Sequence, residues 1–82
     1  MLIRPLNKKV EKQLIRFGLI KKFNKQKFIF ERNPSHPGLN TEKLEPKSVG
    51  LYSFRVDIKF RAIFRISDSA AEILYITKHY QK

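Results

Sequence analysis

Four side chains in this sequence are of the types that cleave an RNA phosphodiester without a metal ion. That reaction needs a base to take the 2′-hydroxyl proton, a cation to stabilise the phosphorane, and an acid to protonate the leaving 5′-oxygen. Arg61 suits the phosphate because a planar guanidinium matches phosphate oxygens, and Arg55 could hold the adjacent phosphate. His79 is the natural acid, since imidazole titrates near neutral pH, and Glu42 is a possible base.

Further candidate substrate contacts are Arg65, Lys78 and Tyr80. Tyr80 could stack on a base, although it could equally pack on a sheet. Arginines on an exposed strand are often only solvated or salt-bridged, which is the alternative for Arg55 and Arg65. A histidine close to a chain end, such as His79, and a loop glutamate, such as Glu42, can also be incidental. His36 precedes a proline in a Pro- and Gly-rich stretch, where a structural role in a turn is the more natural interpretation.

The composition narrows the possible partners and cofactors. The 82 residues predict one domain, residues 1–82, and 18 Lys and Arg against 7 Asp and Glu give a formal net charge of +11. Such a charge attracts polyanions, whether RNA, DNA, acidic lipid or an acidic protein. The sequence has no cysteine, which excludes disulfides and thiol chemistry and fits a cytoplasmic protein. It also has no carboxylate cluster, no glycine-rich phosphate loop and no apolar run long enough for a bilayer, so we expect no metal, no small-molecule cofactor and no membrane.

These candidate residues must be positioned by two helices followed by strands. Apolar residues recur at helical spacing in residues 7–17 and again in residues 19–32, with lysines around them. The members expected to face the core are Val10, Leu14 and Phe17 in the first helix and Ile20, Phe23 and Phe30 in the second. Asn7 can cap the first helix and Gly18 can end it, and the second stops near Asn33, before two prolines.

After a polar connection over residues 39–50, three stretches alternate in the manner of strands: residues 51–57, 60–67 and 71–77. A three-residue loop, residues 57–59, would place Tyr52 opposite Phe64 and Phe54 opposite Ala62 in one apolar layer. The same register would place Arg55 opposite Arg61 on the other face, which we expect to be exposed. That like-charge pair is unfavourable unless a carboxylate or phosphate lies between the two side chains.

The second hairpin, turning at residues 67–70, extends this layer. It would pair Arg65 with Glu72, an opposite-charge match, and Ala62 with Tyr75. Apolar residues left on the arginine face would be Ile63, Leu74 and Ile76. The end of the last strand, followed by His79 and Tyr80, would then lie near the Arg55/Arg61 end of the sheet.

Several short motifs appear in an order that resembles the RelE/ParE toxin superfamily. They are Asn33-Pro34, His36-Pro37, Glu42-x-Leu44, Gly50-Leu51-Tyr52-Ser53-Phe54-Arg55-Val56 and Phe60-Arg61-Ala62-Ile63-Phe64. The resemblance spans essentially the whole chain. It implies an α+β fold in which an N-terminal helical hairpin packs on a small antiparallel sheet, and it leaves open a short N-terminal strand.

The catalytic pattern is most similar to that of YoeB-like ribosome-dependent mRNA interferases. The resemblance implies Glu42 as base, Arg61 on the transition-state phosphate and His79 as acid, with Arg55 and Tyr80 holding substrate. This sequence departs from the YoeB-like pattern by continuing past the tyrosine with Gln81 and Lys82, and by placing Lys78 before the histidine.

The implied function is that of a type II toxin restrained by a cognate antitoxin, with mRNA and the ribosome as targets. Two alternatives stay open: a ParE-like toxin that inhibits DNA gyrase without this nuclease site, and an inactive relative. A nuclease needs Glu42, Arg61 and His79 together, whereas a gyrase inhibitor does not.

Overall fold

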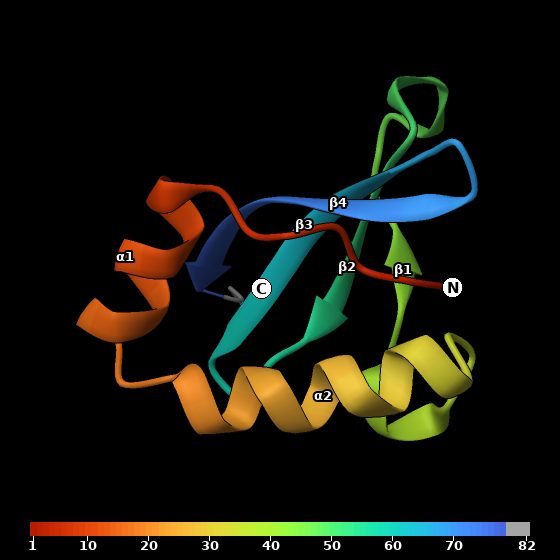
Figure 1. Ribbon diagram of the computed structural model, residues 1–82. Helices are drawn as coiled ribbons and strands as arrows, with labels where there is room; N and C mark the ends of the chain where they lie inside the picture. Colours follow the sequence, from red (N-terminus) through yellow and green to blue (C-terminus); the bar gives the residue numbers. More distant parts are fainter. Residues whose placement is uncertain (79–82) are drawn as a thin grey trace.

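In the computed structural model, which describes residues 1–78, two helices cover one face of a four-stranded antiparallel sheet (Figure 1). The elements are α1 (Lys8–Arg16), α2 (Ile20–Arg32), β1 (Glu42–Lys43), β2 (Leu51–Arg55), β3 (Phe60–Ser67) and β4 (Ala70–Lys78), with 3-10 turns η1 (Pro37–Leu39) and η2 (Lys47–Val49). The strand order is β1-β2-β3-β4. The expected α+β fold, with a helical hairpin on an antiparallel sheet, is confirmed. No helix in the described part of the chain has the length and hydropathy needed to span a membrane.

The helix boundaries follow the predicted capping residues. The Asn7 side chain accepts a hydrogen bond from the Val10 amide at 2.8 Å, which satisfies an amide that has no partner inside the helix. Gly18 has a φ of +67°, a left-handed conformation that lets the chain leave α1 and enter α2. α2 ends at the expected place, with Asn33 as its C-cap.

Two of the predicted core positions on the helices are wrong. Phe17 is the residue after α1 and lies at the rim of the core, so 39% of its surface is exposed. Its ring stacks on that of Phe60, with centroids 4.7 Å apart. Ile20 is 41% exposed, because the buried face of α2 is set by Phe23, Gln26 and Phe30. Phe30 lies at the centre of the core, 5.2 Å from the ring of Phe54.

The predicted register of the first hairpin is confirmed. Tyr52 pairs with Phe64, Phe54 with Ala62, and Arg55 with Arg61. Phe54 and Ala62 are fully buried beneath the helices. The loop is stabilised by Asp57, whose Oδ1 accepts hydrogen bonds from the amides of Lys59 and Phe60, both at 2.8 Å.

The second hairpin begins in the predicted register and then departs from it at a β-bulge. Arg65 pairs with Glu72 as expected, but the register shifts between Ile63 and Phe64, so Ala62 pairs with Ile76 instead of Tyr75. Ile76 therefore enters the core and is not on the arginine face as predicted. Its amide donates to Oε1 of Gln13 on α1 at 2.8 Å. A bulge adds one residue to one strand and re-aims the side chains that follow.

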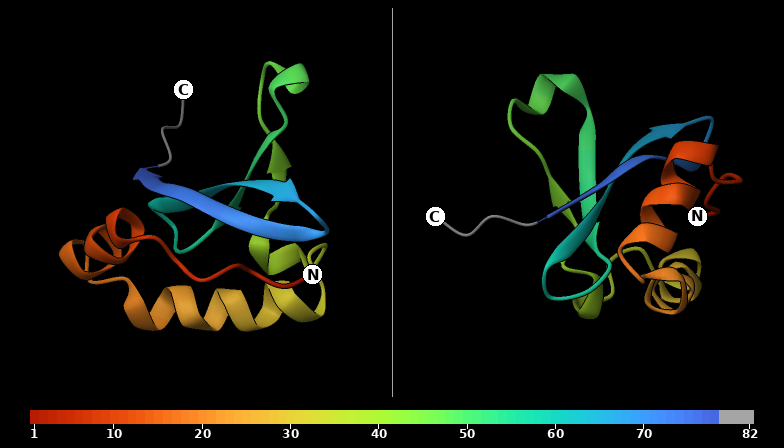
Figure 2. Two further views of the ribbon diagram at one scale, coloured as in Figure 1. Left: turned by 45° about the horizontal axis from the view of Figure 1, so that its top comes forward. Right: turned by 90° about the vertical axis from the view of Figure 1, so that its left-hand side faces the viewer.

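Two short segments complete the sheet. β1 was not predicted as a strand; it pairs with the outer edge of β2, and the connection between them, which carries η2, extends away from both helices (Figure 2). The short N-terminal strand that was left open is present only as an isolated parallel bridge between Ile3 and Ala71. Main-chain hydrogen bonds of 2.8 and 2.9 Å on either side of Ile3 hold this arm against β4.

Candidate functional site

The candidate site is on the sheet face that points away from the helices. Glu42 on β1 pairs with Ser53 on β2, and Ser53 pairs with Ile63 on β3. One row further along, Arg55 pairs with Arg61. Because side chains alternate along a strand and directly opposed residues share a face, both rows lie opposite the Phe54/Ala62 layer. The structure therefore brings Glu42, Arg55 and Arg61 onto one face.

Arg61 is buried, with 4% of its surface exposed, so the prediction that it lies on an exposed face is wrong. Its Nε donates to Ser53 Oγ at 2.8 Å, and its Nη2 donates to the carbonyls of Ser53, at 3.3 Å, and Asn40. The burial arises because the segment leading into β1 folds over this part of the face and the small Ser53 side chain leaves room for the guanidinium. Among residues 1–78, Nη1 is the guanidinium nitrogen without an acceptor.

The charges around Arg61 identify a place where an anion is favoured. Burial lowers the pKa of Arg61, the Glu42 carboxylate raises it, and the neighbouring Arg55 lowers it. An arginine stays charged through such changes. Glu42 and Arg61 thus interact electrostatically, yet they form no ion pair within the described residues. Arg55 is exposed beside them, so a phosphate could relieve the repulsion between the two arginines.

Glu42 is positioned by the loop that precedes it. Asn40 adopts a left-handed conformation, with φ of 46°, and presents its carbonyl to Arg61. Thr41 Oγ1 donates to the carbonyl of Pro34 at 3.0 Å. Nδ1 of His36 accepts the Gly38 amide at 2.9 Å, which is the structural role expected for this histidine. The loop therefore fixes both an acceptor for Arg61 and the start of β1.

A cavity of about 560 Å³ lies behind this loop, on the helix side. Its aromatic lining comes from Phe30, Tyr52 and Phe64, and the loop contributes Asn40 and Thr41 to the lining. The loop is therefore held by its own hydrogen bonds and by Leu39, which is fully buried in the core.

Gln26 is a positioning residue that the sequence analysis did not single out. Its Nε2 donates to the carbonyl of Arg55 at 2.7 Å and to the carbonyl of Gly38 at 3.2 Å. It thereby ties α2 to the end of β2 and to the loop before β1. The available signal was an amide on an otherwise apolar helix face, between Phe23 and Phe30, because buried polar side chains are almost always hydrogen-bonded.

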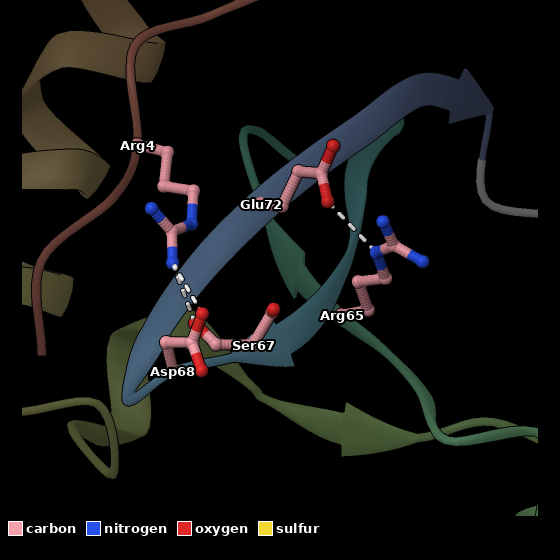
Figure 3. Close-up of polar contacts among 5 residues, drawn as sticks. All are labelled: Arg4, Arg65, Ser67, Asp68 and Glu72. Atoms are coloured by element: carbon pink, nitrogen blue, oxygen red, sulfur yellow. Dashed lines mark hydrogen bonds and ion pairs between the residues drawn. The ribbon is translucent and has the colours of Figure 1, made fainter.

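Arg65 lies apart from this group. Its Nε is 2.7 Å from Oε1 of Glu72 on β4, as the opposite-charge register predicts (Figure 3). It lies four positions beyond Arg61 along β3, roughly 13 Å at about 3.3 Å per residue. Near the same end of the sheet, Arg4 holds the β3–β4 turn through the Ser67 carbonyl, at 2.9 Å, and Asp68 (Figure 3).

The predicted residues at the end of β4 divide into two groups. Thr77 pairs with Arg61, so the strand does end beside the arginine row. Lys78 is exposed and pairs with Phe60, whose ring belongs to the helix-side core, so the structure does not bring Lys78 onto the arginine face. His79 and Tyr80 lie outside the described residues. Within residues 1–78, no three His, Asp or Glu side chains gather as metal ligands would.

Comparison with known proteins identifies the fold. No protein-family model and no curated protein sequence matches the chain at a significant level. Among solved structures, the fold is that of small bacterial toxins. A YoeB/ParE toxin from Agrobacterium tumefaciens aligns over 98% of this chain and 100% of its own, with a TM-score of 0.73 and 20% identity. A chain of the heterotetrameric YoeB–YefM toxin–antitoxin complex from Staphylococcus aureus aligns over 98% of this chain and 99% of its own, with a TM-score of 0.70 and 23% identity. The fold implied by the sequence resemblance is thereby confirmed.

Proposed function

We propose that this protein is the toxin of a type II toxin–antitoxin system and acts as a ribosome-dependent endoribonuclease. The observation that supports this most is the grouping of Glu42, Arg55 and Arg61 on one sheet face, with Arg61 fixed by hydrogen bonds and electrostatically coupled to both neighbours. A fixed cation beside an exposed carboxylate is what metal-independent phosphodiester cleavage requires.

The proposed roles follow from the placement of each group. Glu42 is exposed and free of ion pairs within the described residues, so it can take the 2′-hydroxyl proton. Arg61 is preorganised, its Nη1 is the guanidinium nitrogen left to donate to the phosphorane, and exposed Arg55 holds a neighbouring phosphate. His79 is the proposed acid and Tyr80 a proposed substrate contact, both from the sequence, whereas Lys78 pairs with Phe60 and does not share the arginine face. Arg65, with its guanidinium committed to Glu72, is at most a peripheral contact.

The proposed partners are a cognate antitoxin, mRNA and the ribosome, without a membrane or a small-molecule cofactor. The net charge of +11 favours polyanionic RNA and an antitoxin segment with acidic character. The Staphylococcus aureus YoeB is described in complex with YefM, which supports an antitoxin partner for the same fold.

The alternatives from the sequence analysis are gyrase inhibition and an inactive relative. Neither needs an exposed carboxylate beside a fixed arginine, so the site favours cleavage. Both predict intact transcripts after induction, and gyrase inhibition also predicts damaged DNA.

The test is induction of the chain in cells, followed by primer-extension mapping of transcript ends. We expect growth arrest and new 5′ ends inside coding sequence, both lost in His79→Ala and Glu42→Gln. Arg55→Ala should lose less activity in cells and, as purified protein mixed with ribosomes and message, recover partly at low salt, because phosphate contacts strengthen as the salt concentration falls. Arg65→Ala is the matched strand-arginine control and should remain active. Arrest with intact transcripts in His79→Ala would contradict the nuclease assignment and favour gyrase.

A further inference from the structure

The outer face of α2 carries a stripe of cations interrupted by one aromatic ring. At about 100° per residue, Lys21, Lys25, Phe28 and Arg32 fall within about 60° of one another, diametrically opposite the buried Phe23 and Phe30. All four are exposed, and Phe28 leaves 56% of its surface in solvent. An apolar ring this exposed, in the middle of a basic helix face, is not explained by the core.

The Phe28 ring contacts a guanidinium and also borders a hollow. The guanidinium of Arg32 stacks over the ring, with Cζ 3.6 Å from the centroid, which holds the ring in place. A separate hollow of about 260 Å³ lies against Phe28 and is otherwise lined by Asn24, Lys27 and Glu31. An aromatic ring, an amide, a cation and the Glu31 carboxylate therefore border one space.

We propose that this hollow binds an unpaired RNA nucleotide whose base stacks on Phe28. The Asn24 amide can donate to and accept from the edge of the base, while Lys27 and the stripe of cations hold the flanking phosphates. Glu31, the carboxylate at the border, directs Oε2 to the Ile3 amide at 2.9 Å. Base stacking on exposed aromatic side chains inside a basic groove is a general way to bind single-stranded RNA.

RNA fits this surface better than an acidic protein does. A docked amphipathic helix would need apolar neighbours at helical spacing, whereas Phe28 is the one apolar member of the stripe and the others are cations. α2 carries five Lys and Arg and one Glu, so phosphates complement it along its length.

This site would be a second RNA contact, separate from the sheet face. α2 packs against one face of the sheet (Figure 2), and the strand register places Glu42 and Arg61 on the other face. The inference extends the RNA-binding part of the proposed function, but it does not depend on cleavage, because an anchoring contact on this side leaves the sheet face open to substrate.

The test uses the absence of tryptophan from the chain. Phe28→Trp introduces a fluorophore in the hollow, and Ile20→Trp introduces one about 80° around the same helix as a matched control. The probe is a 2′-O-methyl oligoadenylate, which cannot be cleaved through its 2′-oxygen, so failure of the nuclease assignment does not affect the result. We expect saturable quenching of Trp at position 28 and little at position 20.

Affinity measurements separate stacking from charge. By fluorescence anisotropy, Phe28→Ala should bind the same oligomer about 10-fold more weakly, since one base–aromatic stack contributes roughly that much. Ile15→Ala, which removes another exposed apolar side chain from the basic helices, should bind like the parent. An abasic oligomer and oligoglutamate should not quench Trp at position 28. Equal quenching by the abasic oligomer or by oligoglutamate would overturn base stacking. Base stacking would also be overturned if the oligoadenylate did not bind, or if it bound without quenching Trp at position 28.

Discussion

Replacing Ser53 with alanine removes the hydroxyl that accepts the hydrogen bond from Nε of Arg61 at 2.8 Å. Ser53 is fully buried and Arg61 is 4% exposed, so water cannot readily replace the lost oxygen. A hydrogen bond to a charged group contributes about 1.5–3 kcal/mol. The bonds from Nη2 to the carbonyls of Asn40 and Ser53 survive the change. We therefore expect Ser53→Ala to lower the free energy of unfolding by about 1.5–3 kcal/mol.

The assay is urea denaturation followed by circular dichroism, within a double-mutant cycle. In an Arg61→Met background the donor is absent, so adding Ser53→Ala should change the free energy of unfolding by less than about 0.5 kcal/mol. Ser48→Ala, an exposed serine on η2, is the control and should also stay within about 0.5 kcal/mol. If Ser53→Ala destabilises both backgrounds equally, or neither, the hydroxyl does not hold the guanidinium and our account of Arg61 positioning fails.

Three further perturbations test the surroundings of the site. Gln26→Ala removes the donor to the carbonyls of Gly38 and Arg55 and should lower the free energy of unfolding, measured by urea denaturation, by about 2 kcal/mol. An unchanged urea midpoint would show that these two hydrogen bonds do not stabilise the fold. Burial raises the pKa of Asp57, but hydrogen bonds from the amides of the following turn and from a lysine outweigh burial and lower the pKa below 3.8. The ionised carboxylate therefore stabilises the folded protein above that value, and this stabilisation is lost as the pH falls through the folded-state pKa. The stability gap between the parent and Asp57→Asn at about pH 7 should therefore narrow as the pH falls below 3.8, and a gap that does not change with pH would contradict this. Glu72→Ala breaks a largely exposed ion pair and should lower stability by less than about 1 kcal/mol, with the difference vanishing at high salt.

The first hairpin could be predicted from sequence because two constraints agree there. Side-chain alternation and a three-residue loop both require Phe54 opposite Ala62, and a one-residue slip would bury Arg55. The second hairpin offers no such check after its midpoint. Residues 73–76 are all apolar, so alternation does not distinguish the faces, and the bulge that sends Ile76 into the core is invisible in the sequence.

The sequence predicts which residues share the site better than it predicts how buried each of them is. Register placed Arg55 and Arg61 together, and β1, too short to show alternation, adds Glu42 to the same face. The burial of Arg61 depends on a loop folding over it from more than twenty residues away, through the Asn40 carbonyl. Sequence periodicity carries no information on such a long-range contact, and the default expectation for an arginine is exposure.

A single-turnover assay on ribosomes tests most directly whether the sheet face bearing Glu42 and Arg61 cleaves mRNA. Purified protein is mixed with ribosomes programmed with a defined message, and primer extension follows the 5′ product with time. We predict that Glu42→Gln, an exposed and nearly isosteric change, keeps ribosome binding and loses roughly 10²- to 10⁴-fold in cleavage rate. Cleavage by Glu42→Gln at the parent rate, or a message left intact by the parent protein, would contradict the account.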